Sequence, residues 1–417
     1  MKKKFSKRGL AQFAICCFGG NIGYGVYMLR NTFYDAFLTG FGINNEQFAT
    51  LVSIYASVAM FTYFLGGILC DKMSARGLVA LSMVVNGVCT IYLGTYPSYG
   101  VLKVVYAIMG LCATFTFWAP LQKVTRQMGR NVGGEGKAFG GVEGGRAFAE
   151  MIIGSICVAV GASVATATKG LTFSLTLCGG VLTVCGVAAW FAFKEDDVED
   201  EESGEKYSWK ILLECLKNPC IWVQAFAVLG AYAVTSSLGG YTSKMATVGF
   251  GATAATASII GMFNSYTKPI GAIGGGFVAD KIGRSKTMIV GAAGMGLGAL
   301  AVVLLPKNSG SLVMFTIIYA IIIIFVGIVR GSYYSPLSEG GVPMTYMGTA
   351  VGIVATVGYL PDVFLSRILG RILDSYEGVD ALNRIMYILA GCAAFCILMC
   401  LLFQYIAKKQ AKKEVAA

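Results

Sequence analysis

The sequence predicts an all-α membrane protein whose twelve transmembrane helices form two pseudo-symmetric six-helix bundles. Three observations support this fold class: an apolar composition, twelve long apolar runs, and a motif that recurs at half the chain length. Of the 417 residues, 56% are hydrophobic and 13% are charged, and the mean hydropathy is +0.68. Soluble domains are about half apolar and about a quarter charged, so the composition excludes that class.

Each apolar run is long enough to cross a bilayer, because a helix needs about 20 apolar residues to do so. The runs are separated by charged breaks or by breaks rich in Gly, Pro or Asn. The first run follows a basic start but has no small-residue cleavage site, so we expect a retained helix and not a signal peptide. The spans are expected near residues 10–38, 47–70, 77–96, 100–122, 137–163, 170–193, 219–243, 252–279, 287–305, 311–335, 345–373 and 384–406.

An acidic linker divides the spans into two halves. Eight acidic residues crowd the stretch between spans 6 and 7, and such a like-charge run stays solvated. We therefore expect an N-terminal bundle over 1–193, a cytoplasmic linker over 194–217 and a C-terminal bundle over 218–417. Within the linker, residues 207–216 are expected to form a short amphipathic helix on the membrane surface.

Basic residues indicate the orientation in the membrane. The chain carries 33 Lys and Arg against 22 Asp and Glu, a net charge of +11. The positive charge clusters beside apolar segments, which is the distribution that the positive-inside rule gives for cytoplasmic ends. We therefore expect no nucleic-acid partner, and an integral protein of the cytoplasmic (inner) membrane with both termini in the cytoplasm. The terminal clusters are Lys2, Lys3, Lys4, Lys7 and Arg8, and Lys408, Lys409, Lys412 and Lys413.

The residue inventory argues against an enzyme. The chain has no histidine, which removes histidine metal sites, His-based catalytic triads and histidine proton relays. No phosphate-binding loop, metal-ligand cluster or nucleophile–base pair is recognisable, so no cofactor, metal or catalytic residue is expected. The thirteen cysteines fall in or beside apolar segments and are expected to be reduced packing residues.

A repeated loop motif is the most specific signal. It reads Gly67-Ile-Leu-Cys-Asp71-Lys72 after span 2 and Gly276-Phe-Val-Ala-Asp280-Lys281-Ile-Gly-Arg-Ser-Lys286 after span 8, and the two Asp residues are 209 positions apart. Such a period indicates two homologous halves, as in many secondary transporters. The motif resembles the loop signature G-x-L-a-D-r-x-G-r-K of the major facilitator superfamily. The second copy fits nearly throughout, whereas the first has Ser74 where Gly is expected and Ala75 where a basic residue is expected.

Charges in these loops are expected to form contacts in one transport state that break in another. An Asp near the inner face can pair with a basic neighbour and lie against a helix amino terminus. The candidate gating residues are Asp71, Lys72, Arg76, Asp280, Lys281 and Arg284.

Span 1 carries a finer resemblance. Tyr27-Met-Leu-Arg30-Asn-Thr-Phe33 is similar to the Y-x-x-R-x-x-F of the organophosphate:phosphate antiporter family, and this resemblance implies that Arg30 is an anion ligand. The sequence departs from that family in two features. It lacks the second phosphate-binding Arg that the family has in span 7, and it lacks the His that the family has in span 5. Glu143-Gly-Gly-Arg146, Arg330-Gly331 and Pro361-Asp362-Val-Phe364 look more like the sugar-phosphate-permease-like branch.

Ionisable residues deep in the spans are candidate site residues, because each costs at least about 2.5–3.5 kcal/mol in the bilayer. Arg30 and Lys268 have no carboxylate at helical spacing, so we expect a ligand, a cavity or another helix to compensate them. Their aromatic neighbours Tyr27 and Tyr266 are expected to share the site. The predicted substrate-binding residues are Arg30, Lys268, Tyr27, Tyr266, Arg146 and Arg330.

The deep carboxylates have two open interpretations. Arg146 is spaced to pair with Glu143 at i, i−3 or Glu150 at i, i+4, so these residues are either structural pairs or part of the site. Asp362 follows a mid-span proline and is expected to pair with Arg330 or Lys268, or to carry a proton. The residues assigned to coupling or charge pairing are Asp362, Glu143, Glu150 and Arg367; further aromatic candidates for a cavity wall are Tyr24, Trp118, Tyr232, Tyr333 and Tyr359.

Together these features predict a monomeric secondary active transporter working by rocker-switch alternating access. The expected cargo is a small organic anion, such as a sugar phosphate, sugar acid, sulfonate or carboxylate, because Arg presents a bidentate fork to these groups. Exchange for a counter-anion and proton symport both remain open as coupling modes. One alternative is a neutral sugar or drug transporter, in which the buried charges only pair with one another. The other is a non-transporting ligand sensor of the same fold.

Overall fold

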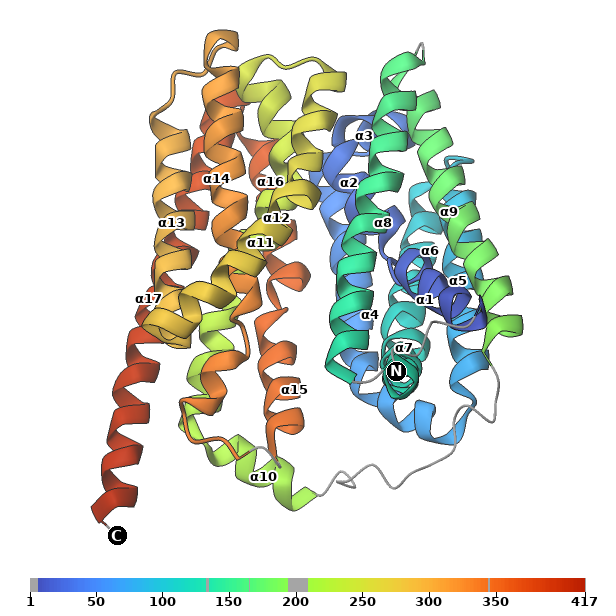
Figure 1. The fold of residues 1–417 in the computed structure, drawn as a ribbon. Coiled ribbons are helices and arrows are strands. Elements are labelled where there is room, and N and C mark those ends of the chain that lie inside the picture. Colours follow the sequence, from blue (N-terminus) through green and yellow to red (C-terminus); the bar gives the residue numbers. More distant parts are fainter. Residues whose placement is uncertain (1–6, 133–134, 165, 194–208, 344–345, 417) are drawn as a thin grey trace. The chain divides into compact units, whose positions relative to one another are not determined.

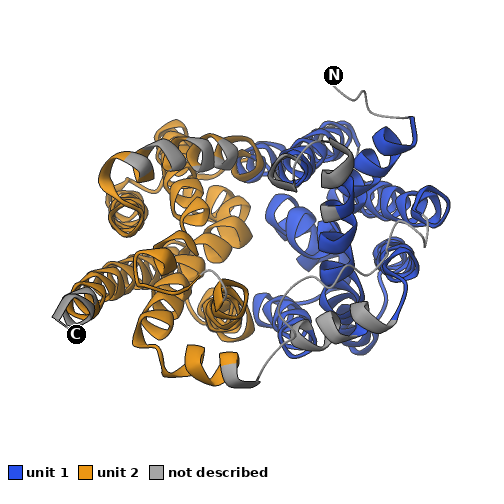
Figure 2. Ribbon diagram, turned by 60° about the horizontal axis from the view of Figure 1, so that its bottom comes forward, with its two compact units in different colours: residues 1–201, 253–262 blue, residues 202–252, 263–417 orange. Residues whose placement is uncertain are grey.

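The protein is described by a computed structural model that covers residues 7–132, 135–164, 166–193, 209–343 and 346–416 (Figure 1). Helices account for nearly all of these residues, and no strand occurs among them. The predicted all-α class is therefore confirmed. The chain forms two compact units, which Figure 2 shows in blue and orange: residues 1–201 with 253–262, and residues 202–252 with 263–417.

Unit 1 contains the predicted spans 1 to 6. Glycines at positions 19, 20, 23 and 25 interrupt span 1, since glycine is a poor helix former. Span 4 instead runs on through a π-helical turn, η2. The elements are α1 (Lys7–Gly19), η1 (Tyr24–Met28), α2 (Leu29–Thr32), α3 (Tyr34–Phe41), α4 (Asn45–Lys72), α5 (Ala75–Leu93), α6 (Tyr99–Ala113), η2 (Thr114–Trp118), α7 (Ala119–Val132), α8 (Glu135–Ser163) and α9 (Ala167–Ala192).

Unit 2 contains the remaining spans. Span 11 is divided in two at Pro361, which occupies the first turn of a new helix, where its missing N–H costs nothing. The elements are α10 (Trp209–Lys217), α11 (Pro219–Phe250), α12 (Ala254–Ile282), α13 (Arg284–Leu304), η4 (Ser309–Ser311), α14 (Leu312–Gly331), η5 (Ser335–Ser338), α15 (Met347–Gly358), α16 (Pro361–Ser375) and α17 (Gly378–Ala416). The beginning of α12 groups with unit 1.

Nine helical segments in the described part of the chain are long and apolar enough to cross a membrane. The other three predicted spans correspond to the interrupted helices α1 to α3, to α4 and to α12. The last two are 28 and 29 residues long. At about 1.5 Å per residue each exceeds the roughly 30 Å of a hydrocarbon core.

Glycine determines how closely helices α5 and α9 pack in unit 1. A Cβ atom added at Gly87 would lie 2.7 Å from the carbonyl oxygen of Gly179, and one at Gly179 would lie 2.5 Å from the carbonyl oxygen of Gly87. Real Cβ atoms do not approach backbone that closely, so neither position accepts a side chain without movement. Small residues of this kind allow transmembrane helices to pack backbone against backbone.

Candidate functional site

Arg30 is buried at the centre of the broken first span. It lies in α2, a four-residue helix, and is only 4% exposed. Its guanidinium interacts electrostatically with the Tyr106 side chain on α6. The Tyr106 hydroxyl is itself buried and has no hydrogen-bond partner among the described residues. This corner of unit 1 thus combines a buried cation with a buried hydroxyl, both groups that an oxyanion ligand can contact.

The π-helical turn η1 carries an aromatic residue three positions before Arg30. Tyr27 lies in this turn and meets Tyr55 of α4 edge to face, with ring centroids 5.5 Å apart and planes at 82°. Single π-turns are frequent at functional sites because the extra residue redirects the side chains that follow. Sequence analysis identified Tyr27 but missed Tyr55, which has no charged neighbour to mark it.

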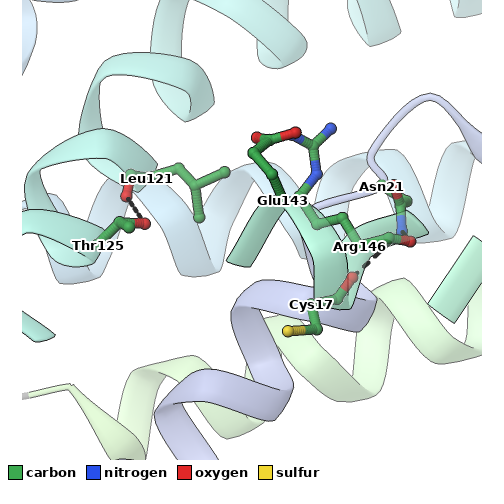
Figure 3. A network of polar contacts seen from close by, with 6 residues as sticks. All are labelled: Cys17, Asn21, Leu121, Thr125, Glu143 and Arg146. Carbon is green, nitrogen blue, oxygen red and sulfur yellow. Dashed lines mark hydrogen bonds and ion pairs between the residues drawn. The ribbon is translucent and has the colours of Figure 1, made fainter. Parts of the chain in front are cut away.

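Arg146 and Glu143 form an ion pair on α8, the i, i+3 pairing that their spacing predicts (Figure 3). The Arg146 Nη1 atom lies 2.7 Å from Glu143 Oε1. The guanidinium also lies 5.4 Å from the centre of the Trp118 ring, which belongs to the second π-helical turn. The Glu143 side chain is 62% exposed, so the protein does not enclose this pair.

Asn21 joins the broken span 1 to α8 at the same place. Its amide nitrogen donates to the backbone oxygen of Arg146 at 2.9 Å and to that of Cys17 at 3.1 Å (Figure 3). The same amide donates to the Tyr24 hydroxyl at 3.2 Å. Glu150 interacts electrostatically with Tyr24. Asn21 thereby holds the Cys17 carbonyl oxygen near the end of α1 and ties this end to α8.

In unit 2, Asp362 is a buried acidic residue. It is 4% exposed, and its Oδ2 accepts a 2.6 Å hydrogen bond from the Tyr232 hydroxyl. The Tyr232 ring packs on Tyr359 with centroids 4.5 Å apart. The Tyr359 and Tyr334 hydroxyls are in turn 2.8 Å apart. Phenolic side chains from three segments of the fold therefore form a chain of contacts that ends at this carboxylate.

The other predicted membrane charges have different surroundings. Arg330 is exposed in the last turn of α14 and interacts electrostatically with Tyr333. Arg367 is exposed on α16. Tyr266 is half-buried on α12 and contacts Phe263 edge to face. The Lys268 side chain lies outside the described part of the structure, so the proposed pairing of Asp362 with Lys268 stays a prediction.

The two copies of the loop motif begin their helices differently. Gly283 precedes α13 with a φ of +93°, a conformation that favours glycine. Ser74 occupies the equivalent place before α5 with a φ of −58°, and its Oγ accepts the backbone N–H of Gly77 at 3.3 Å. In the first copy, Ser74 replaces the glycine of the family signature. A side-chain cap therefore stands where the second copy has a glycine with a positive φ.

In the second copy the residue before α13 is a glycine, which has no side chain to cap the helix, and Glu339 caps α13 instead. Its Oε1 accepts from the backbone nitrogen of Arg284 at 2.7 Å, and its Oε2 accepts from that of Ser285 at 3.2 Å. The Arg284 guanidinium donates to the Ser338 hydroxyl and to the Ser335 carbonyl. Sequence analysis missed Glu339, because a capping residue more than fifty positions away leaves no local signal.

The remaining gating candidates are partly described. Arg76 lies over the Trp190 ring, with its guanidinium carbon 4.5 Å from the ring centre, and Lys281 is exposed. The side chains of Asp71, Lys72 and Asp280 lie outside the described residues.

Comparison with known proteins agrees with this architecture. The sequence profile of the Major Facilitator Superfamily matches residues 15–366. The inner membrane protein YihN of Escherichia coli (strain K12) is 25% identical over 99% of each chain, and YqcE of the same organism, also an inner membrane protein, is 23% identical over 96% of each.

Solved structures of low identity share the fold. The nucleoside transporter NupG has a TM-score of 0.74 at 14% identity and covers 96% of this chain and 99% of its own. A bacterial homologue of the human lysosomal transporter Spinster, inward-facing and unoccupied, has a TM-score of 0.72 at 13% identity and covers 98% of both chains.

Fold and comparisons together define an integral membrane transport protein and not an enzyme. The chain belongs to the Major Facilitator Superfamily.

Proposed function

We propose that this protein is a secondary active transporter that carries a small organic anion across the inner membrane by alternating access. The cargo class comprises sugar phosphates, sugar acids, sulfonates and carboxylates. The observation that carries the proposal is Arg30, a guanidinium 4% exposed within a membrane-spanning bundle. A buried charge of this kind is expensive in a bilayer and is retained where function requires it.

The surroundings of Arg30 fit an oxyanion with a ring or carbon skeleton. The guanidinium supplies a bidentate fork for a planar or tetrahedral oxyanion. The Tyr106 hydroxyl, interacting electrostatically with Arg30, supplies a further donor. The edge-to-face pair of Tyr27 and Tyr55 supplies an apolar surface with hydroxyl groups for the body of the ligand.

For coupling, we favour Asp362 over Glu143 as a proton carrier. Glu143 is exposed and paired with Arg146, so its charge is already compensated. Asp362 is buried and accepts a hydrogen bond from the Tyr232 hydroxyl. A carboxyl group that accepts from Tyr232 can change protonation state between conformations if that contact changes. Anion exchange remains the alternative mode.

The first test is a thermal-shift screen of the purified protein. A ligand that binds the native state raises the melting temperature by mass action. The panel comprises sugar phosphates, uronates, sulfonates, dicarboxylates and their neutral analogues, with Arg30→Gln and Arg30→Lys beside the wild type. Lys103→Gln is the matched control, because Lys103 is an exposed cation that lies on the Tyr99 ring.

The proposal expects one anionic class to stabilise the wild type and Lys103→Gln, with the shift lost in Arg30→Gln and reduced in Arg30→Lys. Stabilisation by neutral sugars or hydrophobic cations alone would refute the anion assignment. Flux of the identified ligand is then measured in proteoliposomes. Binding without flux would indicate a ligand sensor in place of a transporter.

A further inference from the structure

A carboxylate, a guanidinium and an indole meet in unit 1 at Glu143, Arg146 and Trp118. The two charged residues lie within Gly141–Gly161, a segment long and apolar enough to cross the membrane. The Glu143 side chain is 62% exposed, that of Arg146 is 19% exposed, and Trp118 is half-buried. Charged side chains within spans face the protein interior or water, so we expect an aqueous ligand to reach this cluster.

Arg146 keeps hydrogen-bond donors beyond those that its ion pair uses. A guanidinium has five N–H groups, and among the described residues only Glu143 accepts from this one, through Nη1 at 2.7 Å. The Nε atom is buried without a partner in the same part of the chain. The donors left for a ligand are therefore on Nη1 and Nη2.

Hydroxyl pairs hold the π-helical turn η2 that carries Trp118. The Thr114 hydroxyl oxygen lies 2.8 Å from that of Thr62 on α4. The Thr116 hydroxyl oxygen lies 2.6 Å from that of Ser82 on α5. Because η2 is held to two neighbouring helices, the indole is positioned before a ligand binds.

The Arg146 side chain passes over the break in span 1. A Cβ atom at Gly20 would lie 2.9 Å from its Cδ and 3.1 Å from its Cγ, so the glycine leaves room for the arginine. Asn21 then bonds to the Arg146 carbonyl oxygen and to the hydroxyl of Tyr24, the first residue of η1. Arg30 follows in α2, directly after η1. The cluster therefore lies beside the broken span that carries Arg30, within the same unit.

The charge of the cluster limits what it can bind. Glu143 compensates Arg146, so the pair offers donors and acceptors without a formal net charge. A second carboxylate on a ligand would be repelled by Glu143, whereas a hydroxyl group can donate to Glu143 and accept from Arg146. The Trp118 ring offers a flat apolar surface for the C–H face of a ring. This combination fits a ring that carries neighbouring hydroxyl groups.

We propose that Glu143, Arg146 and Trp118 bind the hydroxylated body of the cargo whose oxyanion Arg30 binds. The cargo is then a sugar that bears one acidic group, and dicarboxylates are disfavoured. This inference rests on the proposed function for the anionic end of the ligand and narrows its cargo class. Both parts of the site belong to unit 1.

Thermal-shift titration of the purified full-length protein with five probes tests the proposal, since each apparent affinity follows from mass action. Glucuronate and glucose 6-phosphate carry hydroxyl groups and one acidic group. Cyclohexanecarboxylate keeps a ring and an acid without hydroxyl groups, adipate has two acids, and glucose has hydroxyl groups without an acid.

Two variants and two matched controls are compared with the wild type. Glu143→Gln removes the charged acceptor, and Trp118→Leu removes the indole. Asp380→Asn is the control for the first, because Asp380 belongs to another exposed ion pair within one helix. Trp190→Leu is the control for the second, because it removes another indole that an arginine covers.

Glu143→Gln is expected to weaken binding of both hydroxylated anions by about tenfold, because a neutral amide replaces a charged acceptor. It should hardly change binding of cyclohexanecarboxylate and should tighten binding of adipate, because the repelling carboxylate is gone. Opposite effects on a sugar acid and a dicarboxylate do not arise from a general loss of structure. Trp118→Leu is expected to weaken the hydroxylated anions similarly, with Trp118→Phe as the reserve if the leucine variant fails to fold.

Three outcomes would overturn the proposal: no change of affinity in either variant, equal weakening of glucuronate and cyclohexanecarboxylate, or a wild type that neither hydroxylated anion stabilises. Failure of the Arg30 assignment looks different. Glucose would then bind as tightly as glucuronate and Arg30→Gln would change neither affinity, while Trp118→Leu would still weaken both.

Discussion

The Tyr232 hydroxyl donates a 2.6 Å hydrogen bond to Asp362 Oδ2, joining the long helix α11 to the first turn of α16. The neighbouring backbone of span 11 is interrupted between Tyr359 and Pro361. This phenol–carboxylate contact thus helps to tie an uninterrupted helix to a divided one, together with the hydrogen bond that the Tyr241 hydroxyl donates to the Ser366 carbonyl oxygen. Such a contact stabilises the described conformation and is available to be exchanged in another.

Replacing Tyr232 with Phe removes this donor and keeps the ring that packs on Tyr359. Hydrogen bonds to charged groups contribute about 1.5–3 kcal/mol, so we expect destabilisation of that order. Thermal unfolding followed by circular dichroism measures it. Tyr387→Phe is the control, because the Tyr387 ring is 57% exposed on α17. An equal loss of stability in both variants would show that the buried hydrogen bond to Asp362 does not stabilise the fold.

Replacing Asp362 with Asn separates coupling from binding. The amide keeps the size of the carboxyl group and can still accept from Tyr232, but it cannot carry a proton. If Asp362 couples protons, uphill transport driven by a pH gradient is abolished while counterflow persists. Proteoliposomes loaded with unlabelled substrate measure both activities. Normal uphill transport would exclude Asp362 as the proton carrier.

Glu339→Gln tests the cap of α13. The substitution leaves one oxygen to accept from the backbone of Arg284 or Ser285 and removes a negative charge from a helix amino terminus. We expect a loss of about 1 kcal/mol in stability. Faster hydrogen exchange at the start of α13 gives the local readout. Glu377→Gln, an exposed glutamate before α17, should leave that exchange unchanged.

Gly179 and Gly180 form a matched pair on α9. Alanine at Gly179 places its Cβ 2.5 Å from the Gly87 carbonyl oxygen, whereas at Gly180 nothing lies within 4 Å. We expect Gly179→Ala to cost about 1–3 kcal/mol by overpacking. Gly180→Ala should be neutral or slightly stabilising, because alanine favours helix. Melting temperatures in detergent compare them, and similar values would contradict the packing argument.

Lys307 predicts a pH effect at the end of α13. Its Nζ donates to the carbonyl oxygens of Val302, Val303 and Leu305 at 2.7, 3.0 and 2.9 Å. Burial lowers the pKa of Lys307 below its ordinary value of 10.5. Between the lowered folded-state pKa and 10.5 the unfolded chain binds more protons, so the Lys307 contribution to stability increases with pH.

Lys307→Gln should abolish that dependence. Melting curves of wild type and variant between about pH 8 and about pH 10 measure the difference, since lysines titrate near the top of this range. Parallel curves would mean that Lys307 has the same proton affinity in both states.

The sequence predicts the fold well because its main signals are local. Apolar runs bounded by charges position the spans. Helical spacing also predicts the pair of Glu143 and Arg146, since it depends on one helix alone.

Features that depend on distant parts of the chain are not predictable in this way. The packing of Tyr55 on Tyr27 depends on how α4 lies against η1. The donor to Asp362 is Tyr232, which comes 130 residues earlier and carries no charge that would mark it.

The two caps also differ in how freely each can change during evolution. At Ser74, any short side chain with a hydrogen-bond acceptor preserves the start of α5, so substitutions among such residues cost little stability. Before α13, Gly283 is constrained by its positive φ, and Arg284 and Ser285 are tied to one distant glutamate. A change on that side requires compensating changes elsewhere in the gene. After duplication of an ancestral half, the second copy is therefore the one expected to retain a legible family signature.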